Sequence, residues 1–147
     1  MIAIIKQESQ DVHPLARFVT IEAVARLLNI EATRIKEIRL WRHMILVVAQ
    51  GLSRFVSYAD IPPILGVEPP TEAEMITWRK RWRKLKQKYA PDFWLKFYIR
   101  KFNQSSSLED LRNWGQLIAL IKFAFSEADI QALRISYLKK RGMGYGV

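Results

Sequence analysis

The chain has 147 residues, of which 50% are hydrophobic and 26% are charged, and this composition excludes an intrinsically disordered polymer. Twenty-four Arg and Lys residues against fourteen Asp and Glu residues give a net charge of +10. Such a charge favours a nucleic acid, an anionic membrane surface or an acidic protein as the partner. The sequence has no cysteine and two histidines, which excludes disulfides, thiol catalysis and a Cys-ligated or multi-histidine metal site.

The N-terminal sequence MIAIIKQESQ has a short apolar start followed by polar and acidic residues. It lacks the basic start and the long apolar run of a secretory signal peptide. No stretch reaches the roughly eighteen uninterrupted apolar residues of a membrane-spanning helix. We therefore expect a cytoplasmic protein without membrane contact, with residues 1–17 forming an N-terminal tail.

Two short amphipathic helices are predicted next to each other. In residues 20–28, TIEAVARLL, Thr20 is a good N-cap and the apolar residues recur at helical spacing, and Asn29 can end the helix. In residues 31–41, EATRIKEIRLW, apolar residues repeat every three positions and leave the polar ones facing outward. Two short helices joined by a tight turn predict a helix-turn-helix.

A β-hairpin is predicted directly after this pair. Residues 44–50, MILVVAQ, are rich in β-branched and aliphatic side chains, and residues 54–58, RFVSY, alternate in polarity. The sequence GLS at residues 51–53 supplies the turn. A helix pair followed by a hairpin is a winged helix, whose second helix enters the major groove of DNA while the wing tip reaches adjacent phosphates.

The winged helix predicts which side chains would contact DNA. Those on the second helix or at its end would read base edges, and those at the wing turn would hold the backbone. The seven candidates are Thr33, Arg34, Lys36, Arg39, Arg42, Ser53 and Arg54.

The rest of the chain is predicted to be helical. Prolines crowd residues 62–70, so this segment is expected to be a connector. Four helices, each opened by a polar capping residue, are expected from Thr71 to Tyr89, after Asp92, from Ser107 to Phe125 and from Ser126 to Arg141. We expect residues 66–141 to form a helical extension that makes a homodimer, and residues 142–147 to form a C-terminal tail.

Residues 78–88, WRKRWRKLKQK, concentrate the positive charge. A net charge of +6 falls in residues 66–104, against +2 in each of the two flanking parts of the chain. Trp78 and Trp82 belong to an apolar stripe that we expect to pack in the core or in a dimer interface. The seven Arg and Lys residues then spread over the remaining faces of the helix.

Few acidic residues accompany this segment. Glu72 and Glu74 lie nearby, and they are too few to neutralise the helix by ion pairing. A solvated helix face is one interpretation, and a surface that meets a polyanion is the other. On the second interpretation the predicted contacts to DNA phosphates are Arg79, Lys80 and Arg83.

The sequences TIEAVARLLNIEATRIKEI and GLSRFVSYADI resemble the helix-turn-helix and the wing of MerR-type transcriptional regulators. The two motifs occur in the family's order within residues 18–65. The resemblance implies DNA binding as a dimer, with Arg34, Lys36 and Arg39 on the recognition helix and Arg54 in the wing. In scale the chain is similar to compact members without an effector domain, including regulators associated with mobile elements and CRISPR-associated transposons.

These features predict a mainly α fold, with a winged helix-turn-helix DNA-binding domain at residues 18–65 and a helical extension after it. The predicted function is sequence-specific binding to double-stranded DNA as a dimeric transcriptional repressor, without a cofactor, metal or small-molecule effector. The sequence shows no nucleophile elbow, phosphate loop or paired buried carboxylates, so we do not expect an enzyme. Two alternatives stay open: an RNA-binding or ribosome-associated protein, and a membrane-surface or protein-interaction scaffold.

Overall fold

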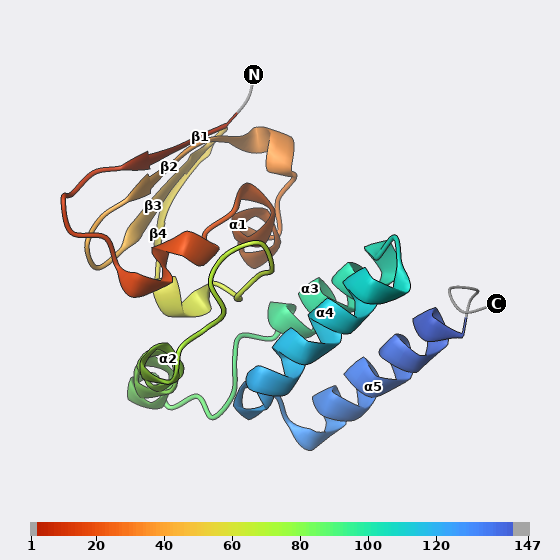
Figure 1. Cartoon of the computed structure of the whole chain (residues 1–147). Helices are drawn as coiled ribbons and strands as arrows, with labels where there is room; N and C mark the ends of the chain where they lie inside the picture. The colour runs from red at the N-terminus through yellow and green to blue at the C-terminus, as the bar shows by residue number, and fades with distance from the viewer. Residues whose placement is uncertain (1–2, 143–147) are drawn as a thin grey trace. The chain divides into compact units, whose positions relative to one another are not determined.

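A computed structural model describes residues 3–142 of the chain (Figure 1). The chain divides between Pro63 and Ile64 into two compact units. We call the part up to Pro63 the sheet unit and the part from Ile64 onward the helical unit, and each is described by itself.

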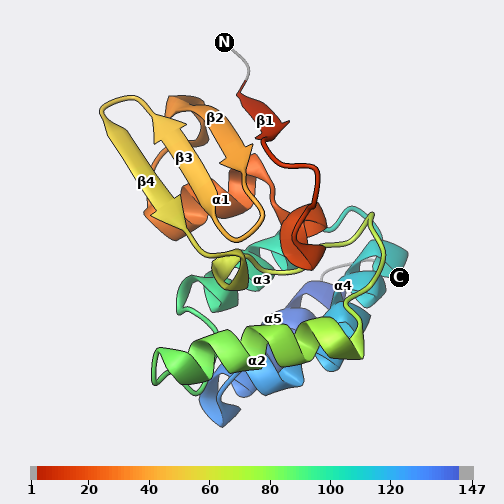
Figure 2. The same cartoon turned by 90° about the vertical axis from the view of Figure 1, so that its left-hand side faces the viewer.

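The sheet unit contains a four-stranded mixed sheet. Its strands are β1 (Ile4–Gln7), β2 (Ile35–Leu40), β3 (Ile45–Ala49) and β4 (Leu52–Val56). They lie in the order β1-β2-β3-β4, with β1 parallel to β2 and the other neighbours antiparallel (Figure 2). Residues 1–17, which we expected to form a tail, therefore supply an edge strand of this sheet.

Helix α1 (Ile21–Leu28) lies against one face of the sheet, behind it in Figure 2. Its ends follow the sequence signals: the Thr20 side chain accepts a hydrogen bond from the backbone N–H of Ala23, and Asn29 adopts the left-handed conformation at φ 55°. Val24 is fully buried between helix and sheet. The first predicted helix is thus present as expected, and it provides the crossover between the parallel strands β1 and β2.

The second predicted helix is absent, and this overturns the helix-turn-helix. Its place is taken by the short 3-10 helix η2 (Ala32–Arg34) and by strand β2. A β-bulge explains the misleading spacing, because Ile35 pairs with Ala49 while Glu37 pairs with Val48, the very next residue of β3. The extra residue lets Ile35 and Ile38, three apart, both be buried. A bulged strand therefore shows the three-residue repeat that is typical of a helix.

A hairpin forms where one was predicted, with its second strand at Leu52–Val56 in place of residues 54–58, but it is not a wing. Strands β3 and β4 are joined at Gly51, whose φ of 74° suits the tight turn. β3 also pairs with β2 along its other edge, so the hairpin is half of the four-stranded sheet. The mainly α fold with an N-terminal winged helix-turn-helix, predicted from the sequence, is therefore wrong. The structure has a four-stranded mixed sheet first and a helical part after it.

Tyr58 ties separate segments of the sheet unit together. It lies in the short 3-10 helix η3 (Tyr58–Asp60), and its hydroxyl donates a hydrogen bond to the backbone carbonyl of Trp41, in the turn between β2 and β3. Its ring stacks on His13 at a centroid distance of 4.3 Å. His13 in turn caps η1 (Pro14–Phe18), which places Leu15 and Phe18 in the core.

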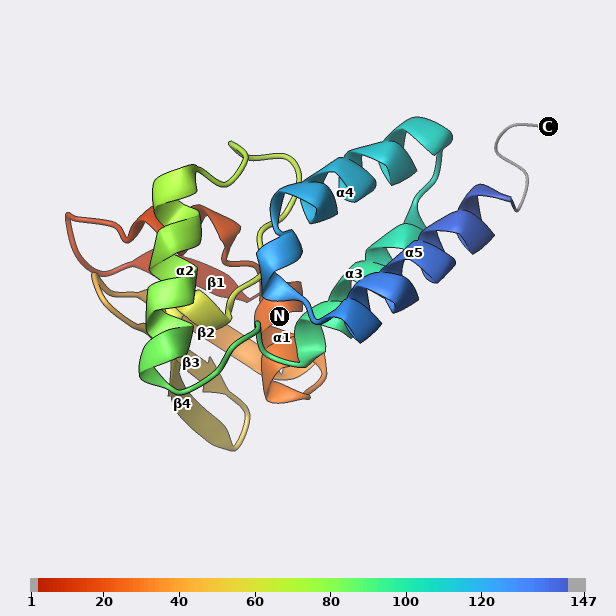
Figure 3. The same cartoon turned by 90° about the horizontal axis from the view of Figure 1, so that it is seen from below.

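The helical unit contains four α-helices. They are α2 (Glu72–Lys84), α3 (Phe93–Gln104), α4 (Leu108–Leu120) and α5 (Glu127–Arg141). The four predicted helices are all present, although the first ends five residues before Tyr89 and the third gives way after Leu120 to the 3-10 turn η4 (Lys122–Ala124). Figure 3 shows α4 and α5 running side by side with α3. Residues 143–147 of the predicted C-terminal tail lie outside the described residues.

Among residues 3–142, none of the helices combines the length and the apolar character that crossing a membrane requires.

Deleting Lys36 tests the bulge. Without this residue Ile35 and Glu37 become neighbours that face Ala49 and Val48, so β2 alternates regularly and keeps its buried side chains. We expect the variant to retain its β-sheet circular dichroism, with a change in unfolding free energy on the order of 1 kcal/mol.

Deleting Arg39 is the matched control, because it moves Leu40 to the opposite face of the sheet. It should lower the free energy of unfolding several-fold more than the deletion of Lys36 does. In a helix each deletion would rotate the following side chains by about 100°. Equal damage from the two deletions would therefore contradict the bulged strand.

The burial of the Tyr58 hydroxyl predicts that the protein loses stability at alkaline pH. Burial raises the pKa of its hydroxyl to about 12, whereas an unfolded chain releases this proton near pH 10. Between about pH 10 and 12 the unfolded state binds fewer protons, so stability falls as the pH rises through this window.

Tyr58→Phe removes this titration. At neutral pH we expect it to be less stable by about 1 kcal/mol, because the Trp41 carbonyl loses its donor. Urea unfolding at a series of pH values measures the free energy of unfolding of both proteins. The difference between wild type and variant should become smaller above pH ~10. A difference in unfolding free energy that does not change with pH would contradict the raised pKa of Tyr58.

Candidate nucleic-acid interface

Helix α2 begins with a reciprocal cap that its sequence encodes. The Thr71 hydroxyl accepts a hydrogen bond from the backbone N–H of Glu74, at 3.2 Å, and the Glu74 carboxylate accepts one from the backbone N–H of Thr71, at 2.9 Å. Glu74 is buried. This carboxylate is therefore committed to the start of the helix and does not extend to the cations further along it.

Two tryptophans fix the inner face of α2. Trp78 and Trp82 are 0% and 1% exposed. Both meet Trp94 of α3 edge to face, with ring centroids at 6.0 Å and 5.3 Å, a geometry that favours aromatic pairs. The two tryptophans of the predicted stripe are therefore core and do not form a base-stacking platform, whereas Leu85, further along the stripe, is 49% exposed.

The cations occupy the rest of the helix surface. All seven Arg and Lys side chains of residues 79–88 are exposed. At about 100° per residue, Lys80 points directly away from the buried tryptophans, and Arg83 and Lys84 lie on either side of it within about 60°. Arg79 lies to one side, with its guanidinium carbon 4.1 Å from the centre of the Phe123 ring.

These cations have no acidic partners within the described part of the chain. None of the seven forms an ion pair there. Arg81, Arg83 and Lys84 lie in the last turn of α2, where the negative end of the helix dipole favours them. Helix geometry and the tryptophan core thus hold a concentrated positive charge that is left available to an anion.

Lys84 was missed among the predicted site residues, although Arg79, Lys80 and Arg83 were included. Its signal is present in the sequence: it stands four residues after Lys80, on the face opposite Trp78 and Trp82. Spacing relative to the apolar stripe would have found it.

The seven candidates in the sheet unit do not form one surface. Thr33 and Arg34 lie in η2, Arg42 in the turn after β2, and Ser53 and Arg54 in the body of β4. Successive side chains of a strand point to opposite faces, so Ser53 and Arg54 cannot both serve one wing tip. Their predicted role at a recognition helix and wing is therefore wrong.

Several of these cations are already engaged within the sheet unit. Arg39 donates to the Glu8 carboxylate at 2.7 Å and lies 3.3 Å from that of Glu37. The hydrogen bond to Glu8 and the attraction of its charge raise the pKa of Arg39. Arg34 donates to the backbone carbonyl of Gln50 at 2.9 Å, so both side chains are engaged within the sheet unit and neither lies on a recognition helix.

Lys36, the remaining member of this group, is the extra residue of the bulge in β2 and is exposed. Arg42 and Asp11 stand 4.0 Å apart, with the Arg42 side chain 64% exposed, so the pair is weak. These positions carry charge without the concentration found on α2.

No protein-family model matches the chain, and neither a curated protein nor a solved structure does. The resemblance to MerR-type regulators therefore stays a prediction from the sequence. The winged fold that it implied is contradicted by the observed sheet.

Replacing Trp82 tests how α2 is held. Trp82→Ala should lower the free energy of unfolding by about 3–5 kcal/mol, because it empties a buried site against Trp94. Lys80→Ala, on the exposed face, should change it by less than about 0.5 kcal/mol. Urea denaturation followed by tryptophan fluorescence measures both. A loss below about 1 kcal/mol for Trp82→Ala would contradict the anchoring role.

Proposed function

We propose that the protein binds nucleic acid by holding the phosphate backbone against the outward face of α2. The observation that carries this proposal is the set of seven exposed, unpaired cations on residues 79–88. An anionic polymer relieves their mutual repulsion and releases its own counterions on binding.

The proposed contacts are to phosphates and not to bases. Lys80, Arg83 and Lys84 lie within about one helical turn, so they meet a short stretch of backbone together. Such contacts position a protein on nucleic acid without reading its sequence. They predict fast, strongly salt-dependent binding with little discrimination between sequences.

The regulatory role expected from the sequence depended on a recognition helix. The sheet unit has a strand in place of that helix, and a dimeric transcriptional repressor stays a prediction from the resemblance. The coarser part, affinity for a polyanion, rests on α2 and is independent of the sheet unit. Duplex DNA and RNA share the backbone chemistry and are separate arms of the experiment below.

A membrane surface is the less favoured polyanion. An interfacial helix inserts an apolar face with its aromatic side chains into the headgroup region. In α2 the tryptophans that would do so are buried within the helical unit. Ile76 is an exposed large apolar residue of α2, and a single side chain does not make the apolar face that an interfacial helix inserts.

Charge reversal on α2 tests the proposal. The triple variant Lys80→Glu, Arg83→Glu, Lys84→Glu should weaken binding to a labelled 30-base-pair DNA duplex by at least about tenfold at moderate salt. Because each lost phosphate contact removes roughly 0.9 from the slope of log affinity against log salt, the slope should fall by roughly 2 to 3. Fluorescence anisotropy over a salt series measures both, with an RNA duplex and a single strand run in parallel.

The control changes the net charge equally in the sheet unit. Lys36→Glu, Arg42→Glu, Arg54→Glu should leave the salt slope close to that of the wild type. If this control loses as much affinity as the α2 variant, α2 is not the binding surface. If no nucleic acid binds the wild type at low salt, the proposed function is wrong.

A further inference from the structure

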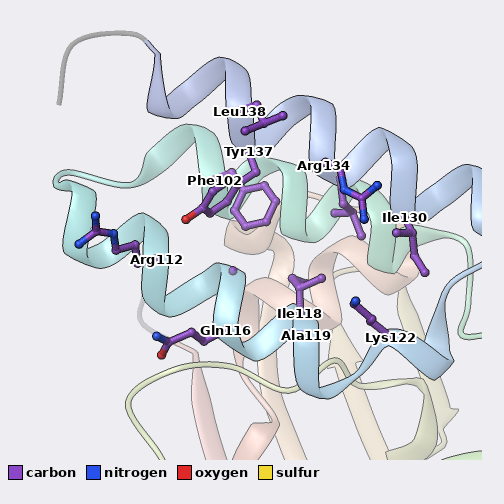
Figure 4. Close-up of a pocket in the computed structure, with 12 residues that line it drawn as sticks. Phe102, Arg112, Gln116, Ile118, Ala119, Lys122, Ile130, Arg134, Tyr137 and Leu138 are labelled. Carbon is purple, nitrogen blue, oxygen red and sulfur yellow. The ribbon is translucent and has the colours of Figure 1, made fainter. Parts of the chain in front are cut away.

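A groove runs between α4 and α5 within the helical unit, with a volume of about 380 Å³ (Figure 4). Phe102 of α3 contributes to its lining, so all three helices shape it. It does not include any of the α2 cations, and it is therefore a second feature of the helical unit beside the proposed nucleic-acid surface.

The lining of the groove is mostly apolar. Its apolar residues include Phe102, Ile118, Ile130, Leu133, Tyr137 and Leu138. Leu138 is 45% exposed, whereas Leu133 is buried beneath it. An apolar surface of this kind, left open along a channel between two helices, favours an apolar guest.

Three cations stand along the groove. They are Arg112 of α4, Lys122 just after α4 and Arg134 of α5, and all three are exposed. The lining contains no Asp or Glu, and none of the three forms an ion pair within residues 3–142. The groove therefore combines an apolar floor with positive charge on both walls.

Gly115 of α4 lies in close contact with the Tyr137 side chain of α5. A Cβ atom at this position would lie 2.8 Å from Cε2 of Tyr137, closer than carbon atoms pack. Glycine thus allows the Tyr137 ring of α5 to lie directly against α4. With any larger residue the ring would have to move.

From this arrangement we propose that the groove docks an amphipathic helix of a partner protein, with acidic residues flanking its apolar stripe. Arg112 lies eight residues before the end of α4 at Leu120, which corresponds to about 12 Å or roughly two turns of a guest helix, and Lys122 lies just beyond that end. Leu-type side chains at i, i+3, i+4 and i+7 would fill the floor.

The distribution of the cations favours a helix over an anion with one head group. A carboxylate or phosphate on a single alkyl chain could pair at one end of the groove only. Acidic side chains on both edges of a guest helix can reach Arg112 and Lys122 on one wall and Arg134 on the other. Charge complementarity along the whole groove therefore indicates the acidic amphipathic helix.

The experiment measures binding of two fluorescein-labelled 18-residue peptides to the full chain. The first carries Leu at helical spacing with Glu on both flanks and Ala elsewhere. The second has the same composition in an order without helical periodicity, so its net charge is equal. We expect the striped peptide to bind at least about tenfold more tightly than the scrambled one, because only it presents an apolar face.

Protein variants locate the binding site. Ala119→Glu places an anion at an exposed position of the lining and should weaken binding of the striped peptide at least tenfold. The triple reversal Arg112→Glu, Lys122→Glu, Arg134→Glu should do the same. The α2 triple reversal, which changes the net charge equally, should retain the preference for the striped peptide, and circular dichroism checks that each variant is folded.

Four results would overturn the proposal. Equal binding of the two peptides would mean that charge alone attracts them. Loss of the preference in the α2 variant would mean that the striped peptide binds at α2 and not in the groove. Binding of laurate in the groove without binding of the striped peptide would mean that the ligand of the groove is a small amphiphile and not a helix. Self-association that Ala119→Glu abolishes, seen by sedimentation, would mean that a second copy covers the groove. None of these results depends on whether α2 binds nucleic acid.

Discussion

The packing of Trp78 and Trp82 against Trp94 is the interaction on which the helical unit depends. These rings are almost fully buried and meet edge to face, and aromatic side chains of this size contribute more to a core than other residues do. Because they take up one face of α2, the cations between them in the sequence must lie on the others. The same contact thus stabilises the unit and concentrates its charge.

The proposed interface and the groove use positive charge in different ways. On α2 the cations stand on the exposed side of the helix with the two tryptophans buried on the other side, which suits the evenly charged backbone of a nucleic acid. Along the groove the cations border an exposed apolar floor, which suits a guest that presents both acidic and apolar side chains. The basic residues behind the net charge of +10 therefore occur in two different surroundings, and the composition alone does not distinguish them.

The sheet unit shows why a local motif can mislead. The bulge in β2 places Ile35 and Ile38 on one face at helical spacing, and polar residues lie between them. Helix α1 before it and the hairpin after it complete what resembles a helix-turn-helix with a wing. What decides for a strand is pairing with β1 on one edge and β3 on the other. β3 follows closely in the sequence, but β1 lies about thirty residues earlier, and the periodicity of residues 35–40 reveals neither pairing.

The sequence by itself determined the features that depend on neighbouring residues. The cap at Thr20, the left-handed Asn29, the turn at Gly51 and the reciprocal cap of Thr71 with Glu74 all form as the sequence indicates, because each is a local hydrogen bond or backbone preference. It also determined the burial of the α2 tryptophans. Tertiary structure alone decided that residues 35–40 form a strand and that Arg39 is engaged by Glu8. It also decided that Arg112, Lys122 and Arg134 line one groove, since these outcomes join residues distant in the chain, whose pairing a local pattern does not encode.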